Sequence, residues 1–286
     1  MGIKNKVKKV LKKIKKTFTW KIKEPIKIPV CIGDLLKERT IIITGGASGI
    51  GYEIAKLAIN NKANVIICGR NEKKLKEASL KLKKETNVEK EKVFYYRLDI
   101  SNKDTLEEEF SKIVLKHKVD TLVNNAGISI GSRFLETNIS DLNKTINTNL
   151  EGTYNLSQIF SRYLIKNKIK GNILNISSIS GYRPAISPYM LSKWGINGLT
   201  KGMAKMLIKY GIIVNGIAPG PTITSMIEHD ENNLYYEKSP SERFLDPVEV
   251  ANLAIYLISD MGRMIVGETI PITGGCGNLT YDDIEY

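Results

Sequence analysis

The sequence predicts an α/β fold in which a doubly wound parallel sheet carries helices on both of its faces. Seven short runs rich in β-branched residues alternate with longer segments of helical period, which is the pattern of repeated βαβ units. The runs are apolar almost throughout, as expected of strands that are buried on both faces. The first run passes directly into the glycine-rich stretch GGASGIG at 45–51. A chain of 286 residues can bury such a core without disulfide or metal support.

Strands and helices are expected in alternation along the body of the chain. The runs that predict strands are TIIIT at 40–44, NVIIC at 64–68, VFYYRL at 93–98, DTLVN at 120–124, GNILNI at 171–176, GIIVNGIA at 211–218 and ETIPI at 268–272. Segments of helical period predict helices at 49–61, 71–85, 103–116, 141–167, 188–209 and 246–258. The last helix has the clearest start, because Asp246-Pro247-Val248-Glu249 supplies an N-cap, a first-turn proline and a capping-box acid.

The positive charge of the chain is concentrated at its amino terminus. Residues 1–30 hold eleven lysines and one acid, Glu24, which gives this segment a net charge of +10 out of +13 for the whole chain. The remaining 256 residues carry only +3, so the body gives no support for nucleic-acid binding. We therefore expect a basic extension at 1–37, one catalytic domain at 38–277 and a short tail at 278–286.

The basic extension has the pattern of an amphipathic helix. Its apolar residues fall on one helical face, and lysines fill the other; the apolar positions are Ile3, Val7, Val10, Leu11, Ile14 and Phe18. Such a helix suits the surface of an anionic membrane, so residues 3–20 predict a peripheral membrane contact. A solvated lysine-rich tail explains the same composition equally well, and a protein or nucleic-acid partner comes third. No continuous apolar core of a signal peptide or membrane span is present.

Cysteine and histidine are too sparse for a disulfide framework or a structural zinc site. The three cysteines, Cys31, Cys68 and Cys276, lie far apart, and the only histidines are His117 and His229. The sequence therefore predicts no metal site and a reducing compartment. We expect a cytoplasmic protein, or one held peripherally at the inner face of the membrane.

The three glycines Gly45, Gly49 and Gly51 follow a strand and open a helix, where they suit the binding of a dinucleotide. Unpaired amides and the helix dipole can hold a phosphate there. One glycine permits the tight turn, another lets the backbone approach the pyrophosphate, and a third lets helix and strand pack closely. The alternative is a simple strand-to-helix turn, which the surrounding βαβ frame disfavours.

The spacing TGxxxGxG resembles the nucleotide-binding motif of the classical short-chain dehydrogenase/reductase family, which has a single Rossmann-type domain. Further motifs of that family follow in its order, over about residues 38–277. They are NNAG at 124–127, Asn149 in NLEG, ISS at 176–178, the YxxxK pair in YMLSK at 189–193, and PG at 219–220. The resemblance implies an oxidoreductase that moves a hydride between a nicotinamide cofactor and a carbonyl or alcohol, and a homo-oligomer, either dimer or tetramer.

The resemblance also implies a catalytic set, and the chemistry of its residues agrees. Tyr189 and Lys193 are four residues apart in a helical segment, so they share a face, and an ammonium beside the phenol is expected to lower its pKa. Tyr189 is the implied acid/base, and Lys193 is implied also to bind the nicotinamide ribose. Ser178 can hydrogen-bond the substrate carbonyl, whereas Ser177 is expected to cap the strand end. Asn149 resembles the family's asparagine that holds a water in the proton relay.

The end of the second predicted strand bears on the choice of cofactor. Gly69 stands where an NAD-selecting acid is expected, and Arg70 can pair with a 2′-phosphate, so NADP is favoured and NAD is the alternative. The residues expected at the cofactor are Gly45, Ala47, Ser48, Gly49, Ile50, Gly51, Arg70, Asp99, Ile100, Asn125, Ala126, Gly127, Tyr189, Lys193, Pro219, Gly220 and Thr222.

We expect an NADPH-dependent reductase of a ketone or aldehyde, for which a 3-oxoacyl, lipid or glycan-precursor carbonyl is the substrate class. The irregular segment 222–245 is expected to cover the substrate, with apolar contacts from Met226, Ile227, Leu234, Tyr235 and Tyr236. A sugar-nucleotide epimerase is disfavoured by the glycine spacing and the short carboxyl-terminal region. A non-catalytic dinucleotide sensor or scaffold, tethered by the basic extension, is disfavoured because it needs no Ser178/Tyr189/Lys193 set.

Overall fold

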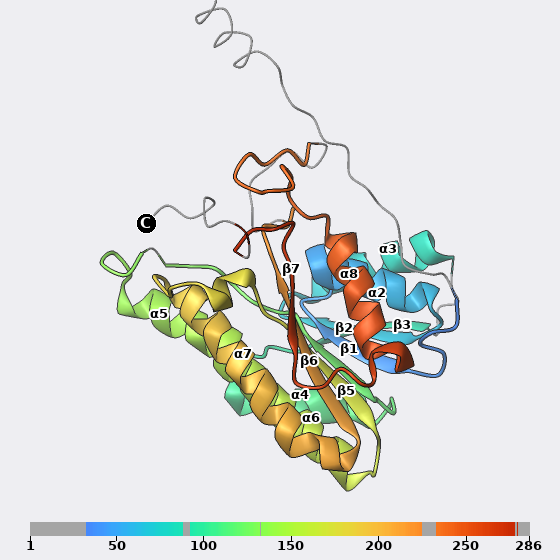
Figure 1. The fold of residues 1–286 in the computed structure, drawn as a ribbon. Helices are drawn as coiled ribbons and strands as arrows, with labels where there is room; N and C mark the ends of the chain where they lie inside the picture. The colour runs from blue at the N-terminus through green and yellow to red at the C-terminus, as the bar shows by residue number, and fades with distance from the viewer. Residues whose placement is uncertain (1–32, 88–91, 132, 225–232, 278, 280–286) are drawn as a thin grey trace, which may run out of the picture.

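The computed structural model describes residues 33–87, 92–131, 133–224, 233–277 and 279. It contains a seven-stranded sheet in the order β3-β2-β1-β4-β5-β6-β7, and all neighbouring strands are parallel. Helices cover both faces (Figure 1). The α/β fold class and the doubly wound sheet are therefore confirmed. The predicted helix at 3–20 and nearly all of the tail at 278–286 lie outside the described residues.

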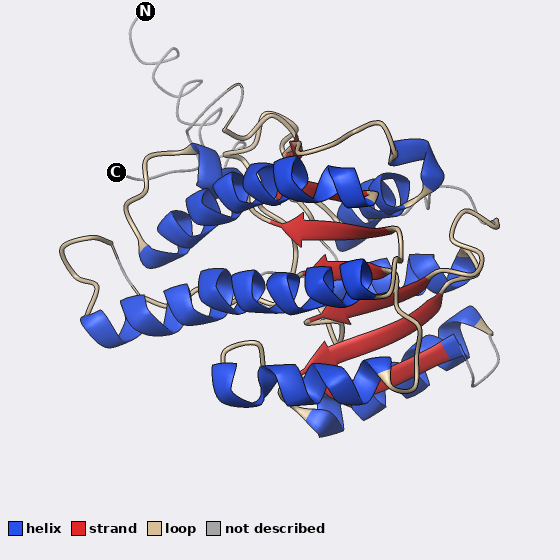
Figure 2. Ribbon diagram, turned by 90° about the horizontal axis from the view of Figure 1, so that it is seen from below, coloured by secondary structure: helices blue, strands red, loops and turns tan. Residues whose placement is uncertain are grey.

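The strands lie where the apolar runs predict them, to within about two residues. They are β1 (Thr40–Thr44), β2 (Asn64–Gly69), β3 (Val93–Arg97), β4 (Thr121–Asn124), β5 (Gly171–Ile176), β6 (Ile212–Pro219) and β7 (Thr269–Ile272). Figure 2 shows the arrows pointing in one direction. The strand order reverses between β1 and β4, and ligands of such folds bind at the carboxyl edge beside that reversal.

Two hydrophobic cores hold the helices against the sheet. On one face lie α2 (Gly49–Asn60), α3 (Glu72–Thr86) and α8 (Pro247–Ile258); on the other lie α4 (Lys103–Val114), α5 (Ile139–Ile146), α6 (Gly152–Lys166) and α7 (Pro188–Leu207). Successive residues of β1 alternate between the two cores: Ile41 and Ile43 join the first, and Ile42 joins the second. This two-sided burial explains why the strands read as continuous apolar runs.

The long helix predicted at 141–167 is interrupted. The structure has α5, a π-helical segment at Asn147–Glu151, and then α6. A π-turn adds a residue without ending the helix, so the apolar period hides it, and such turns are frequent at functional sites. Gly152 follows the π-turn, where an added Cβ would lie 2.5 Å from the carbonyl oxygen of Ile100. The helix therefore passes close to the chain that follows β3.

Local contacts fix the start of α8 and hold the chain that precedes β1. The capping box of α8 is confirmed, because Asp246 accepts from the Val248 amide and Glu249 accepts from the Asp246 amide, both at 2.9 Å. Before β1, Leu35 packs against the first core, and Leu36 is fully buried and donates its amide to Asn61 O at 3.0 Å. Within the described residues, no helix has both the length and the apolar character that a bilayer crossing requires.

Candidate active site

A pocket of about 830 Å³ lies at the carboxyl edge of the sheet. Residues 233–245, orange in Figure 1, lie over this edge. Most of the predicted site residues line it: Gly45, Ser48, Gly49, Ile50, Asn125, Ala126, Gly127, Ser178, Tyr189, Lys193, Pro219, Gly220 and Thr222. Segments that are far apart in the sequence thus meet in one cavity, because the carboxyl ends of parallel strands share one edge.

The glycine-rich turn has the geometry of a phosphate cradle. Gly45 and Gly49 have φ angles of +66° and +55°, which favour glycine. At Gly51 a Cβ would lie 2.6 Å from the Gly45 carbonyl oxygen, so helix α2 packs too closely for a side chain. Ser48 is the N-cap of α2, yet its side chain makes no capping hydrogen bond. The first-turn amides of α2 are therefore available to a phosphate, and the residues present fit a dinucleotide.

Asn125 holds this turn from behind. Its Nδ2 donates to the carbonyl oxygens of Thr44 at 3.0 Å and Gly45 at 3.2 Å. The amides of Asn125 and Ala126 both donate to Thr44 Oγ1 at 3.0 Å. The Asn125 side chain, which the resemblance places in contact with the cofactor, is thus engaged in fixing the turn's shape.

Five other predicted cofactor residues are not in the pocket lining: two belong to the glycine-rich turn and the start of α2, and three follow β2 or β3. They are Ala47, Gly51, Arg70, Asp99 and Ile100. Arg70 is exposed just after β2, and no ion pair of its guanidinium occurs within the described part of the chain. Asp99 accepts from the amide and hydroxyl of Ser101 at 3.0 and 2.7 Å, and Ile100 is buried in the second core.

Helix α7 presents Tyr189 and Lys193 to the pocket. Its start is fixed by Ser187, whose Oγ accepts from the Met190 amide at 3.3 Å, and by Pro188 in the first turn. Lys193 Nζ lies 5.5 Å from the centroid of the Tyr189 ring and donates to Ile176 O at 2.8 Å. The predicted i, i+4 pair is therefore formed, and it faces inward.

The two serines after β5 differ in what their hydroxyls contact. Ser178 Oγ accepts from the Ser180 amide at 3.1 Å and caps the 3-10 helix Ile179–Tyr182. It also hydrogen-bonds Tyr189. Ser177 Oγ donates to Asn197 Oδ1 at 2.6 Å, toward α7. The capping role expected for Ser177 thus belongs to Ser178, because the 3-10 helix begins directly after Ser178.

Burial dominates the pKa values of the tyrosine and lysine. It raises the pKa of Tyr189, and the hydrogen bond with Ser178 opposes this rise. Burial also lowers the pKa of Lys193 to about 8. The expectation that the pKa of Tyr189 is lowered is wrong, because burial of the phenol is the largest influence on it and raises it.

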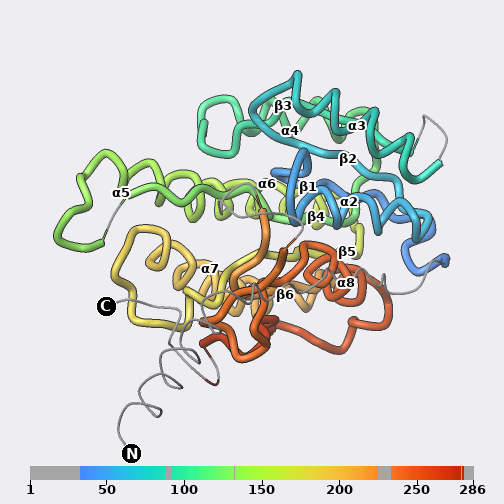
Figure 3. The backbone as a smooth tube through the Cα atoms, turned by 90° about the horizontal axis from the view of Figure 1, so that it is seen from above, coloured from blue at the N-terminus to red at the C-terminus, as the bar shows by residue number. Residues whose placement is uncertain are grey.

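Asn149 lies in the π-helical segment and is 2% exposed. Its Oδ1 accepts from the Ile128 amide at 2.8 Å, and its Nδ2 donates to Ile128 O at 2.8 Å and to Ser192 Oγ at 3.1 Å. A Cβ on Gly127 would lie 3.4 Å from Asn149 Oδ1 and 3.8 Å from Lys193 Nζ. The asparagine and the lysine therefore approach the same point from two helices, which Figure 3 shows side by side (α5–α6 and α7).

The segment over the pocket differs from its prediction in detail. Tyr236 lines the pocket as expected, and it stacks on Phe244 with ring centroids 4.3 Å apart. Leu234 is 1% exposed because it packs in a small core of this segment's own, and it does not line the pocket. Tyr235 pairs with Arg243 through a β-bridge. Met226 and Ile227 lie outside the described residues.

Several residues of the pocket lining were not predicted as site residues; they include Ser129, Ile179, Arg183, Met190, Thr224 and Phe244. Arg183 is 3% exposed, and its carbonyl oxygen accepts from Trp194 Nε1 at 2.6 Å. Arg183 stands between the predicted residues Ser178 and Tyr189 in the sequence, and this position could have identified it as a site residue. Phe244 lies within the predicted covering segment 222–245, where its aromatic side chain was the available signal.

Replacing Lys193 by methionine is expected to raise the free energy of unfolding at pH 7 by about 1 kcal/mol or more, even with the bond to Ile176 lost. Burial places the folded-state pKa of Lys193 at about 8, below its usual 10.5. The unfolded chain therefore binds more protons between these values, and the penalty for burying the ammonium shrinks as pH rises through this window. Urea unfolding of the unmodified chain and of Lys193→Met, near pH 7 and near pH 10, measures the two free energies of unfolding and their dependence on pH. A methionine variant that is less stable at pH 7 would contradict it.

Known proteins resemble this chain in sequence and in fold. The family described as short chain dehydrogenase matches residues 39–234. A 3-oxoacyl-[acyl-carrier-protein] reductase of Chlamydia muridarum is 35% identical over 250 residues, which are 85% of this chain and 99% of that protein. A 3-oxoacyl-[acyl-carrier protein] reductase from Brucella melitensis with bound NAD has a TM-score of 0.78 at 28% identity, and covers 89% of this chain and 99% of its own. The structure of an actinorhodin polyketide ketoreductase with NADPH has a TM-score of 0.76 at 27% identity. The match covers 84% of this chain and 97% of the ketoreductase chain.

Proposed function

The chain belongs to the short-chain dehydrogenase/reductase family, and from this premise we propose that it is an NADPH-dependent reductase of a ketone or aldehyde. Members of the family act on CH–OH or C=O groups with NAD(P). The observation that supports a working enzyme is the meeting of Ser178, Tyr189 and Lys193 in the pocket that also contains the glycine-rich turn. A 3-oxoacyl thioester is the proposed substrate class, supported by the reductase that is 35% identical.

We propose the following roles in carbonyl reduction. A bound NADPH supplies the hydride that reaches the carbonyl carbon. The Ser178 hydroxyl donates a hydrogen bond to the carbonyl oxygen as negative charge develops there. Tyr189 donates its phenolic proton to that oxygen, which completes the alcohol. The raised pKa of Tyr189 keeps the phenol protonated before the step.

Lys193 is proposed to return a proton to Tyr189 from a water of the proton relay, and Asn149 is proposed to hold that water. The lysine Nζ lies near the tyrosine ring, and the asparagine approaches the same point from the π-helical segment. The Asn149 side chain is held by Ile128 and Ser192, so the π-turn is fixed in place beside the lysine. Lys193 is proposed also to donate to the nicotinamide ribose. The proposed proton path thus runs through side chains of this chain and a water, and the proposal includes no metal ion.

Replacing Arg70 by alanine is expected to raise the KM for NADPH by about tenfold and to leave the KM for NADH nearly unchanged. The exposed guanidinium after β2 can pair with a 2′-phosphate, which NADH lacks. Steady-state kinetics with each cofactor measures the two constants. Arg263→Ala, an exposed arginine after α8, is the matched control. Equal effects of Arg70→Ala on both cofactors would refute the proposed preference for NADP and favour NAD.

The test of the proposed function is turnover on a panel of carbonyl compounds. The purified chain is mixed with NADPH or NADH and with 3-oxoacyl thioesters, simple ketones or keto-sugars, and absorbance of the reduced cofactor is followed. The proposal expects the highest kcat/KM with NADPH and a 3-oxoacyl thioester. Tight NADPH binding with no turnover of any carbonyl would favour the alternative, a non-catalytic sensor or scaffold.

We also propose a cytoplasmic homo-oligomer, either a dimer or a tetramer. The outer face of α6 and α7 supports self-association, because it exposes Tyr154, Leu191 and Trp194 at 49%, 51% and 49%. Shallow apolar hollows lie between these helices, beside Leu150 and Gly195. A second copy of the same face would cover these side chains.

A further inference from the structure

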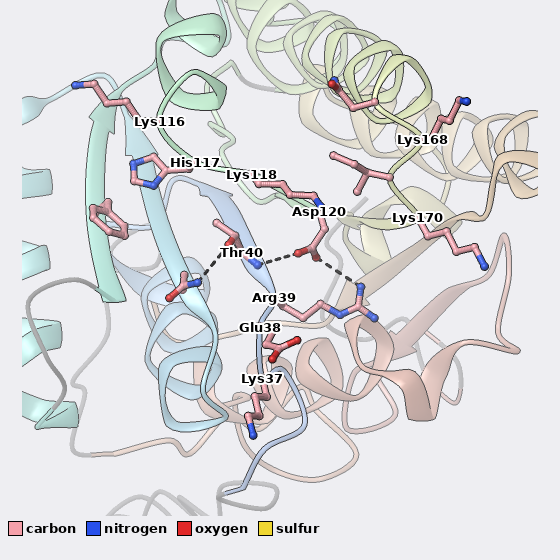
Figure 4. A pocket seen from close by; sticks show the side chains of 14 residues that line it. Lys37, Glu38, Arg39, Thr40, Lys116, His117, Lys118, Asp120, Lys168 and Lys170 are labelled. Carbon is pink, nitrogen blue, oxygen red and sulfur yellow. Dashed lines mark hydrogen bonds and ion pairs between the residues drawn. The ribbon is translucent and has the colours of Figure 1, made fainter.

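A second pocket, of about 700 Å³, lies at the amino edge of the sheet, opposite the proposed active site. Figure 4 shows Lys37, Lys116, Lys168 and Lys170 around it, with Arg39 and Asp120 near its centre. In a parallel sheet the segments that precede the strands share one edge, so the loops before β1, β4 and β5 meet here. We call this the basic pocket; its charged lining is Lys37, Glu38, Arg39, Lys116, Lys118, Asp120, Lys168 and Lys170, with His117 beside them.

The positive charge of the basic pocket is not balanced within the described residues. Five lysines and one arginine face two acids, Glu38 and Asp120. Asp120 is already engaged: it accepts from the Thr40 amide at 2.9 Å and from Thr121 Oγ1 at 2.6 Å, and lies 3.6 Å from Arg39. In the part of the chain that is described, none of the five lysines forms an ion pair. The pocket therefore offers free cationic groups to an external anion.

Apolar side chains project from the same edge. Leu115, which directly precedes Lys116, is 83% exposed. Met261 and Met264 are 60% and 86% exposed in the segment between α8 and β7. The Arg39–Asp260 ion pair, at 3.0 Å, ties this segment to the start of β1 beside the basic pocket. Exposed lysines interleaved with large apolar side chains suit a membrane surface, where the two kinds of group meet phosphates and acyl chains.

The lysine-rich segment of the chain is joined to the body at this edge. Residues 33–39 lead directly into β1, and Leu36 and Arg39 both bond to the loop after α2. The eleven lysines of residues 1–30 precede this segment in the sequence. We propose that the amino edge of the sheet, formed by the basic pocket and the apolar side chains Leu115, Met261 and Met264, docks the body on an anionic phospholipid surface. The proposed active site then faces away from the bilayer and stays open to substrate.

The test measures partition of the full-length chain onto vesicles of phosphatidylcholine with and without phosphatidylglycerol. Lys116→Glu/Lys170→Glu is compared with Lys76→Glu/Lys103→Glu, which makes the same charge change on α3 and α4. The pocket variant is expected to bind at least about tenfold more weakly than the control, because each lysine near such a surface contributes about 1 kcal/mol. Thermal unfolding of both variants verifies that they fold, and the basic extension is intact in both.

The apolar side chains and the remaining outcomes decide the proposal. Leu115→Ser/Met264→Ser is expected to weaken vesicle binding several-fold relative to Leu80→Ser, an exposed leucine on α3. Equal binding of the pocket and control charge variants would overturn the proposal and assign membrane binding to residues 1–30 alone. Undiminished binding to vesicles of phosphatidylcholine alone would overturn it as well. A loss of DNA binding without a loss of vesicle binding in the pocket variant would identify a nucleic acid in place of the membrane.

Discussion

Tyr189→Phe is expected to lower kcat for carbonyl reduction by about 10³-fold, within the range of general acid–base effects, while NADPH affinity stays nearly unchanged. The phenol is the one described acidic group in the pocket that bonds to Ser178, beside which the carbonyl oxygen is proposed to lie. Phenylalanine keeps the ring and its packing but has no proton to donate. Steady-state kinetics gives kcat, and fluorescence titration with NADPH gives the affinity.

Tyr210→Phe is the control for this substitution. Tyr210 follows α7 at the opposite edge of the sheet and is 45% exposed, so loss of its hydroxyl should leave kcat unchanged. If Tyr189→Phe retained most of the turnover, the proton would come from another donor, and the proposed role of Tyr189 would be wrong. If both variants lost activity equally, the effect would be structural.

Gly51→Ala is expected to weaken NADPH binding by roughly 10- to 100-fold, since overpacking of about 1–3 kcal/mol converts to that factor. An added Cβ would lie 2.5 Å from Asn125 Nδ2 and 2.6 Å from the Gly45 carbonyl oxygen. Relief of this clash requires α2 to move away from the turn that it supports. The shift would displace the first-turn amides proposed to bind the pyrophosphate. Calorimetric titration with NADPH measures the change.

The matched control for this substitution is Gly202→Ala on α7. Nothing lies within 4 Å of the Cβ that alanine would add there, and the position is in the interior of a long helix. Alanine should therefore stabilise the protein by about 0.5–1 kcal/mol and leave NADPH affinity unchanged. If Gly51→Ala bound NADPH as tightly as Gly202→Ala, the glycine-rich turn would not be the phosphate site.

The apolar runs predicted the sheet well because each strand is buried on both faces. Ile41, Ile42 and Ile43 contribute to two different cores from one strand, and only an unbroken apolar run meets that need. The capping box at Asp246 could also be predicted from the sequence, because its hydrogen-bond donors and acceptors are neighbours in the sequence. Features that depend on local sequence were thus predicted correctly.

Features that depend on contacts between distant segments could not be read from the sequence. The π-turn at Asn149 keeps the helical period, and Gly152 is explained only by the approach of Ile100 from another segment. Leu234 was placed at the substrate, yet it packs against the covering segment's own residues Ile223 and Phe244. The pKa of Tyr189 was expected to fall because sequence spacing shows the lysine and does not show the burial.

The central claim is that this chain transfers hydride from NADPH to a carbonyl carbon with Tyr189 as the acid. Its most direct test uses NADPH deuterated at the transferable position, a 3-oxoacyl thioester and mass spectrometry of the product. We expect one deuterium on the hydroxyl-bearing carbon of the product when the unmodified chain is used, and almost none with Tyr189→Phe. Bound NADPH that yields no deuterated alcohol from this or any other carbonyl of the panel would contradict the claim and leave a dinucleotide-binding protein without the proposed chemistry.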